Sequence, residues 1–254
     1  MLWYLASGSL NEYLKSQIQL QGQYYSKQAT ALAFADFSTN TGIGIFTDIT
    51  LANPKDYQAT NALIIDEVSL ELSLSQLTTP DKSTSPFQKK HDSITTIKQL
   101  TINTLTLNKE VNGTNQKEKQ SNIAQLMALI KNQLALDYPK FYPEISAKLY
   151  AQKKPELNAD TYSKSHPDAG PIVEYKETKK KRGKPQARII IQAITIRNLE
   201  LNITDNNKKN TIHLSDLQLS SIGGKRGIVS NQIGGEILLT LLNLAQQQHP
   251  SSPK

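Results

Sequence analysis

The side chains that could carry acid–base or metal chemistry are scattered along this chain. Its histidines are far apart in sequence, at His91, His166, His213 and His249. None is followed by a second histidine at the i+3 or i+4 spacing that places two imidazoles on one helix face. The chain contains no cysteine, which excludes thiolate zinc sites, disulfides and cysteine nucleophiles. We therefore expect no metal ligand, no catalytic residue and no cofactor.

Three carboxylates of one predicted strand are the remaining candidates for paired acid–base groups. Asp66 and Glu67 are adjacent, and Glu71 follows shortly after them. Because side chains alternate along a strand, Asp66 and Glu67 should point to opposite faces, whereas Glu67 and Glu71 share the polar face. A solvated outer face explains them better than a reaction centre does. Since no nucleophile and base are clustered, the sequence predicts a protein that is not an enzyme.

Two glycine-rich segments could cradle a phosphate. They are Gly42-x-Gly44 and Gly223-Gly224-x-x-Gly227, and neither contains the Gly-Lys-Ser/Thr of a P-loop. The first precedes a predicted strand. The second opens a predicted helix, whose N-terminus could take an anion beside Lys225 and Arg226. Turns that need a positive φ are the favoured interpretation of both segments.

The excess of positive charge is concentrated in one stretch. The formal net charge is +7, and the stretch that nearly accounts for it includes the run Lys179, Lys180, Lys181 and Arg182. A solvated loop is the first interpretation of this run. Contact with anionic lipid headgroups is the second, for which Lys225 and Arg226 are further candidates. Nucleic acid is the weakest alternative, because Tyr175 is the only aromatic residue close to the run.

The composition still allows a core built from short strands. Apolar residues make up 37% of the chain, below the usual share, but leucine, isoleucine and valine are concentrated in short blocks. No stretch approaches the roughly 20 apolar residues of a membrane-spanning helix. The short apolar segment 1–6 is either the stub of a longer anchor or an ordinary first turn.

Helical and strand periods alternate in the first part of the chain. A capping box at Ser9 and Glu12 precedes apolar residues at helical spacing, which predicts a helix over 10–20. Strands are predicted over 31–37, over 43–51 and over 64–74. In the second of these, alternation should place four residues on one face: Ile43, Ile45, Ile49 and Leu51.

The most informative feature is an internal echo. Residues 97–108 can be laid over residues 191–202, so that Ile97, Leu100, Ile102, Leu105 and Leu107 coincide with Ile191, Ile194, Ile196, Leu199 and Leu201. Both copies interrupt the two-residue alternation, as a β-bulge or a kink does. Ile212, Leu214, Leu217 and Leu219 repeat the interrupted pattern. We expect both copies in one sheet, with the third unit forming a hairpin across the polar turn 206–210.

Two further helices are predicted in the second half. Ser121 should cap a helix that carries Ile123, Leu126, Met127, Ile130 and Leu134 on one side. Ser230 should cap a very apolar final helix over 233–244. A polar insertion over about 139–187, partly helical up to about residue 150, is expected between them, and a tail over 246–254 follows.

Three segments together resemble the AsmA-like family of bacterial envelope proteins. They are residues 41–54, with Gly42-x-Gly44, a strand and Asn53-Pro54; residues 63–72; and residues 217–244, where Ile222-Gly223-Gly224 precedes the apolar helix. Such proteins usually carry an N-terminal transmembrane anchor, here missing or reduced to residues 1–6, before a body that faces the periplasm. The wider class includes long β-grooves implicated in moving phospholipids between envelope membranes.

These patterns predict an α+β protein with a curved, mainly antiparallel β-sheet of repeated strand units, covered on one face by two or three amphipathic helices. Residues 1–20 are expected as an amphipathic helix that includes a candidate anchor remnant, and 21–245 as the AsmA-like domain. The resemblance implies a non-enzymatic periplasmic protein, anchored in the inner membrane in its natural form, that handles lipid or supports outer-membrane homeostasis. The alternative is a structural or adaptor module that binds a protein partner. A membrane lipid, a membrane surface or a protein is the expected partner, and nucleic acid is not.

Overall fold

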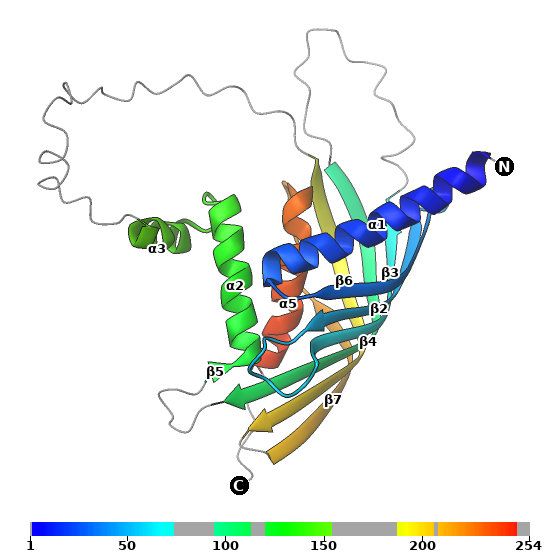
Figure 1. Ribbon diagram of the computed structural model, residues 1–254. Coiled ribbons are helices and arrows are strands. Elements are labelled where there is room, and N and C mark those ends of the chain that lie inside the picture. Colours follow the sequence, from blue (N-terminus) through cyan, green and yellow to red (C-terminus); the bar gives the residue numbers. More distant parts are fainter. Residues whose placement is uncertain (1, 74–93, 113–119, 154–186, 206–207, 248–254) are drawn as a thin grey trace, which may run out of the picture.

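The protein is built on one curved, open, mixed β-sheet that is combined with helices (Figure 1). The computed structural model describes residues 2–73, 94–112, 120–153, 187–205 and 208–247. Helices precede, interrupt and follow the strands of the sheet along the chain. This arrangement confirms the α+β class.

Six long strands form the main path of the sheet. Their spatial order is β1 (Thr30–Ser38), β2 (Ile43–Ala52), β3 (Asn61–Leu72), β4 (Ile94–Asn112), β6 (Arg188–Asp205) and β7 (Lys208–Leu219). The two-residue strands β5 (Gln120–Ser121) and β8 (Ile228–Val229) pair with β4 and β6. Neighbours are antiparallel except β4 and β6, which are parallel. Among the described strands, β1 and β7 are therefore the two edges of the main path.

The two copies of the internal echo are direct neighbours in this sheet. In the parallel pair of β4 and β6, Ile97 lies opposite Ile191 and Leu107 lies opposite Leu201, so equivalent residues of the two copies are in register. The third unit, β7, returns antiparallel to β6, which confirms the predicted hairpin. A parallel pair needs a crossover connection, and the chain between β4 and β6 supplies it.

The interrupted alternation occurs at the same level in all six long strands. Two inward rows run across the sheet, Leu32–Ile49–Ile65–Leu105–Leu199–Leu214 and Ala35–Phe46–Val68–Ile102–Ile196–Leu217. Between the rows, each strand has two consecutive residues that are not buried. We call this line the crease. Because every strand crosses it with the same number of residues, the pairing register does not shift there, and the crease is a shared kink and not a bulge in one strand.

The crease explains why the four residues predicted on one face of β2 do not share it: Ile49 and Leu51 lie inward, and Ile43 and Ile45 do not. Ile43 and Ile45 are 46% and 38% exposed, whereas Gly44 and Phe46 are buried. The prediction assumed unbroken alternation along the strand. Asp48, at the crease, adopts a left-handed φ of 54° and changes the phase.

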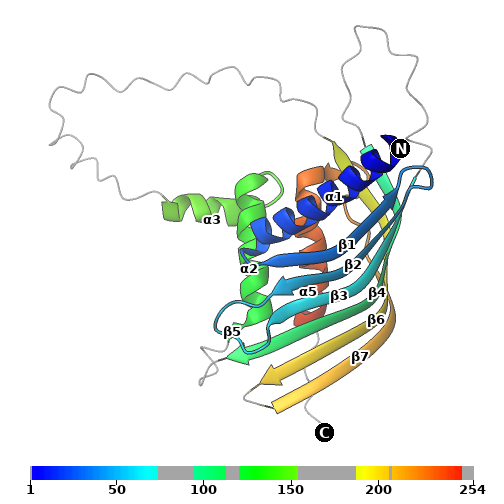
Figure 2. The ribbon, with the colours of Figure 1, turned by 45° about the vertical axis from the view of Figure 1, so that its right-hand side comes forward.

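Three long helices pack against the sheet. They are α1 (Leu2–Ser26), α2 (Asn122–Asp137) and α5 (Ile233–Gln247), and the shorter α3 (Pro143–Lys153) lies beside α2. Figure 2 shows α2 and α5 on the concave side of the sheet, with α1 running along β1. Leu105 of β4, Leu126 of α2 and Leu242 of α5 are fully buried in one shared core.

The three predicted helix caps have different outcomes. Ser9 is not a cap, because it lies inside α1, which begins at Leu2. The Ser121 hydroxyl accepts a hydrogen bond from Ala124 N at 3.1 Å, which confirms it as the N-cap of α2. Ser230 is not the cap of the final helix, because it begins the 3₁₀ turn η2 (Ser230–Gln232) and α5 starts only at Ile233.

Several element boundaries extend beyond those predicted. The helix expected over 10–20 runs from Leu2 to Ser26. The expected polar insertion 139–187 contains α3, and α5 continues to Gln247, inside the expected tail. Within the described residues, no helix combines the length and the apolar character that crossing a membrane requires.

Candidate functional site: a groove at the end of β7

The basic residues proposed as headgroup contacts fall in two places. Lys225 and Arg226 are exposed in a turn whose glycines Gly223, Gly224 and Gly227 all have positive φ, between 49° and 96°. This confirms turn geometry as the reason for the glycines. The turn does not open a helix, because β8 and η2 separate it from α5, so the anion site at a helix N-terminus is wrong. The run 179–182 lies outside the described residues.

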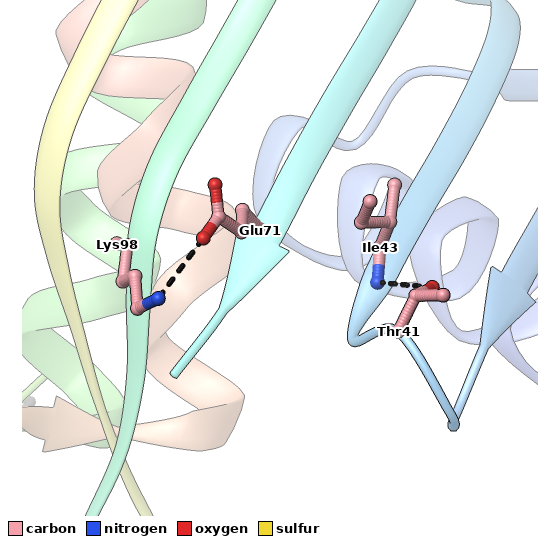
Figure 3. Close-up of polar contacts among 4 residues, drawn as sticks. All are labelled: Thr41, Ile43, Glu71 and Lys98. Atoms are coloured by element: carbon pink, nitrogen blue, oxygen red, sulfur yellow. Dashed lines mark hydrogen bonds and ion pairs between the residues drawn. The ribbon is translucent and has the colours of Figure 1, made fainter. Parts of the chain in front are cut away.

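The acidic candidates are on the solvated surface. Asp66 and Glu67 are both exposed, because the crease passes between Ile65 and Val68, so they do not point to opposite faces as predicted. Glu71 forms an ion pair with Lys98 of β4 at 3.0 Å, with both side chains about half exposed (Figure 3). The same figure shows Thr41 Oγ1 accepting a hydrogen bond from the Ile43 amide at the start of β2. The ion pair joins the neighbouring strands β3 and β4, and the hydrogen bond lies within the turn between β1 and β2.

The histidines give no metal centre in the part of the chain that the structure describes. His213 is exposed on β7, opposite Glu200 of β6. His91, His166 and His249 lie outside the described residues. Among the described residues, no group of three histidine, aspartate or glutamate side chains is placed to hold a metal ion.

Sequence reasoning missed a buried carboxylate, Glu110 at the end of β4. Its Oε1 accepts hydrogen bonds from Ala59 N at 2.6 Å and from Asn53 Nδ2 at 3.1 Å, and its Oε2 accepts one from Gln58 N at 2.7 Å. Glu110 N in turn donates to Asn122 Oδ1 at 2.9 Å. Three donors on one carboxylate satisfy its charge, so the group fixes the turn after β2 and does not offer a free base.

Asn122 joins this network to the first turn of α2. Its Nδ2 donates to Asn53 Oδ1 at 2.8 Å and to Asn108 O at 2.6 Å. The Asn53-Pro54 segment is thereby locked to β4 and α2. We conclude that the network is a structural clamp, since its hydrogen bonds are made to backbone groups and to other members of the network.

Continuing the alignment of the echo two residues beyond its end gives a signal that could have pointed to this clamp. Glu110 and Lys109 of β4 lie opposite Thr204 and Ile203 of β6, so charged residues stand where the other copy has neutral ones. Lys109 is also buried, and its Nζ donates to Ala245 O at the end of α5 at 2.9 Å. Burial lowers the pKa of this amine from its ordinary value. Two adjacent charged residues, aligned with neutral ones just past the repeat, therefore accompany the clamp.

The concave face is filled over most of its width and incompletely covered beside β7. The inward residues of β4 and β6 are buried along both strands. The corresponding residues of β7 are only half-buried: Ile212, Leu214, Leu217 and Leu219. The apolar rows of the sheet therefore reach one edge where their cover is incomplete.

A groove of about 460 Å³ lies between the C-terminal end of β7 and the helices α2 and α5. Leu219 of β7, Met127 of α2, and Leu239 and Leu244 of α5 contribute apolar surface to it. Polar side chains also line it, including Lys131 of α2 and three residues of α5: Thr240, Asn243 and Gln247. This combination can hold an apolar chain while leaving a polar or anionic end at the rim.

Comparisons of the chain with protein-family models, with curated proteins and with solved structures found no match.

Proposed function

We propose that the protein is a non-catalytic, AsmA-like module of the bacterial envelope that handles lipid by receiving an acyl chain in the groove beside β7. The observation that supports this proposal is the incomplete cover of the concave face along that strand, where leucine and isoleucine side chains stay half-buried. Every methylene moved from water into such a groove contributes about 0.8 kcal/mol. A chain of about ten buried methylenes would contribute about 8 kcal/mol, from which the cost of association is subtracted.

The charge around the groove favours an amphiphile with an anionic head. Lys131 lines the groove, and the turn that carries Lys225 and Arg226 follows closely on Ser220, which also lines it. A headgroup held at this rim remains solvated while its chain is buried. We propose a periplasmic location and an inner-membrane anchor in the natural protein on the resemblance of segments 41–54, 63–72 and 217–244 to the AsmA-like family.

Native mass spectrometry of protein purified gently from membranes, with lipid extraction in parallel, tests the proposal. We expect phospholipid or fatty acid to be retained at a defined ratio. The variant Thr240→Trp, which places a large ring in the groove, should release it. The matched control Thr211→Trp, at an exposed position of β7, should retain it. Equal retention by both variants, or a lipid-free mass for the unaltered protein, would contradict the proposal.

A second candidate function is a structural or adaptor module that binds a protein partner. It is favoured by the filled concave face over β3, β4 and β6, where helices take the space that a wide lipid trough would need. A lipid-free protein with unchanged stability in the Thr240→Trp variant would support this candidate.

A further inference from the structure

The two edge strands differ in whether side chains form hydrogen bonds with their outer backbone N–H and C=O groups. On β1, α1 supplies partners for the backbone groups: Lys15 Nζ donates to Ala33 O at 2.9 Å, and Asn11 Oδ1 accepts from Phe37 N at 3.0 Å. Among the described residues, no side chain is hydrogen-bonded to the backbone of β7. An edge strand with unoccupied N–H and C=O groups is a template for another strand.

The apolar rows of the sheet end at this open edge. Leu199 of β6 pairs with Leu214 of β7, and Ile196 pairs with Leu217, so each row continues across an established strand interface and then stops at a half-buried side chain. A strand added beside β7 would extend both rows by one residue. Its inward side chains would lie on the side of the sheet where the groove near Leu219 is already lined by residues of α5.

We propose that β7 accepts an extended peptide segment of a partner protein by strand addition. The crease specifies the chemistry of that segment. Its apolar side chains must be spaced by two, three and two residues, as Ile212, Leu214, Leu217 and Leu219 are, so that its own kink falls at the crease. Main-chain hydrogen bonds to β7 supply affinity, and the interrupted spacing supplies selectivity.

This inference does not rest on lipid binding. A strand beside β7 and an acyl chain in the groove would both use Leu219, so the two should compete. A peptide that binds lipid-free protein and is displaced by phospholipid vesicles would support both. A peptide that binds with no lipid retention in any preparation would leave strand addition supported and the proposed function contradicted.

A synthetic peptide with the sequence of residues 194–203 provides the test, because this segment already matches the rows of β7 from the other side. The peptide carries a fluorophore, and its binding to the full chain is followed by anisotropy. Two further peptides carry N-methyl groups on alternate amides. In one peptide the methyl groups block one hydrogen-bonding edge of the strand, and in the other they block the opposite edge. We expect one of these to bind as the parent does and the other to bind at least about tenfold more weakly, since several main-chain hydrogen bonds are lost.

A pair of variants locates the binding. Leu214→Lys places an inward-pointing charge on the β7 edge and should abolish peptide binding. Ala33→Lys, on the exposed surface of the opposite edge strand, should leave it unchanged. Thermal unfolding establishes that both variants fold. If Leu214→Lys does not fold, the methylated peptides still decide the matter. Equal binding of the two methylated peptides, or no binding of the parent peptide, would overturn the proposal.

Discussion

The two edges of the sheet carry equivalent residues in different surroundings. Leu32 of β1 and Leu214 of β7 belong to the same inward row, yet Leu32 is fully covered and Leu214 is half-buried. At β1, α1 covers the strand and also bonds its free backbone groups. The difference shows that the pattern of a strand does not determine its exposure. Whether a helix covers the strand, as α1 covers β1, decides which edge stays open.

Alanine substitution of Leu32 and of Leu214 is the most direct test of the difference between the two edges. Leu32→Ala should lower the free energy of unfolding by about 3 kcal/mol, because it leaves a cavity under α1. Leu214→Ala should cost about 1 kcal/mol, since part of its surface is already in water. Urea unfolding of both variants measures the difference. Equal losses would contradict the account of an open edge at β7.

Removal of the Glu110 carboxylate should also lower the free energy of unfolding, but this loss does not depend on whether either edge strand is covered. Glu110→Ala leaves the amides of Gln58 and Ala59 without their acceptor, at a cost of about 2 kcal/mol. Glu110→Gln, which keeps an acceptor oxygen, should lose less. Unfolding followed by circular dichroism gives both values. A loss below that of Leu214→Ala would argue against the clamp.

The attachment of α1 can be tested through Tyr25. This buried phenol donates to Asn231 O at 2.7 Å, and burial raises its pKa well above the ordinary value. The neutral phenol therefore contributes stability that is fully present below pH 10 and is lost as the pH rises above 10, where the unfolded chain ionises. Tyr25→Phe should cost about 1 kcal/mol at neutral pH from the lost hydrogen bond.

The alkaline behaviour of that variant gives the control. Because phenylalanine cannot ionise, the unfolding free energy of Tyr25→Phe should fall less between pH 9 and pH 11 than that of the unaltered protein. Parallel curves for the two proteins would show that Tyr25 does not contribute in this way.

The smallest effect is expected from the side chains that cap the β1 edge. The double variant Asn11→Ala with Lys15→Ala removes three hydrogen bonds, two of them exposed and one partly buried, and should cost no more than about 0.5 kcal/mol. Its local effect should be clear, because the Phe37 amide loses its acceptor. Hydrogen exchange at β1 should therefore become faster, with β7 unchanged. Unaltered exchange at Phe37 would show that α1 does not protect this edge.

The sequence was informative where strand pattern and cap chemistry act locally. The echo placed equivalent residues of β4 and β6 in one sheet, and Ser121 was identified as a helix cap from its position before an apolar helical pattern. The single face predicted for Ile43, Ile45, Ile49 and Leu51 of β2 was wrong, because the phase change at Asp48 follows from the kink shared with neighbouring strands. One strand read alone does not show that constraint.

The remaining features depend on contacts between distant segments. Glu110 gains its donors from a turn about fifty residues earlier, so no local pattern marks it as buried. The groove depends on where α5 lies relative to β7, and the apolar period of α5 is compatible with several positions on a sheet. The resemblance to AsmA-like proteins and the function that it implies stay predictions.

The accessibility of one thiol at each edge tests the open edge at β7 most directly. The chain has no cysteine, so Leu219→Cys in the groove and Leu32→Cys under α1 each introduce a single reporter. Reaction with a water-soluble disulfide reagent under native conditions should be at least about a hundredfold faster at position 219, because position 32 must first open locally. Equal protection of the two thiols, or faster reaction at position 32, would contradict the account.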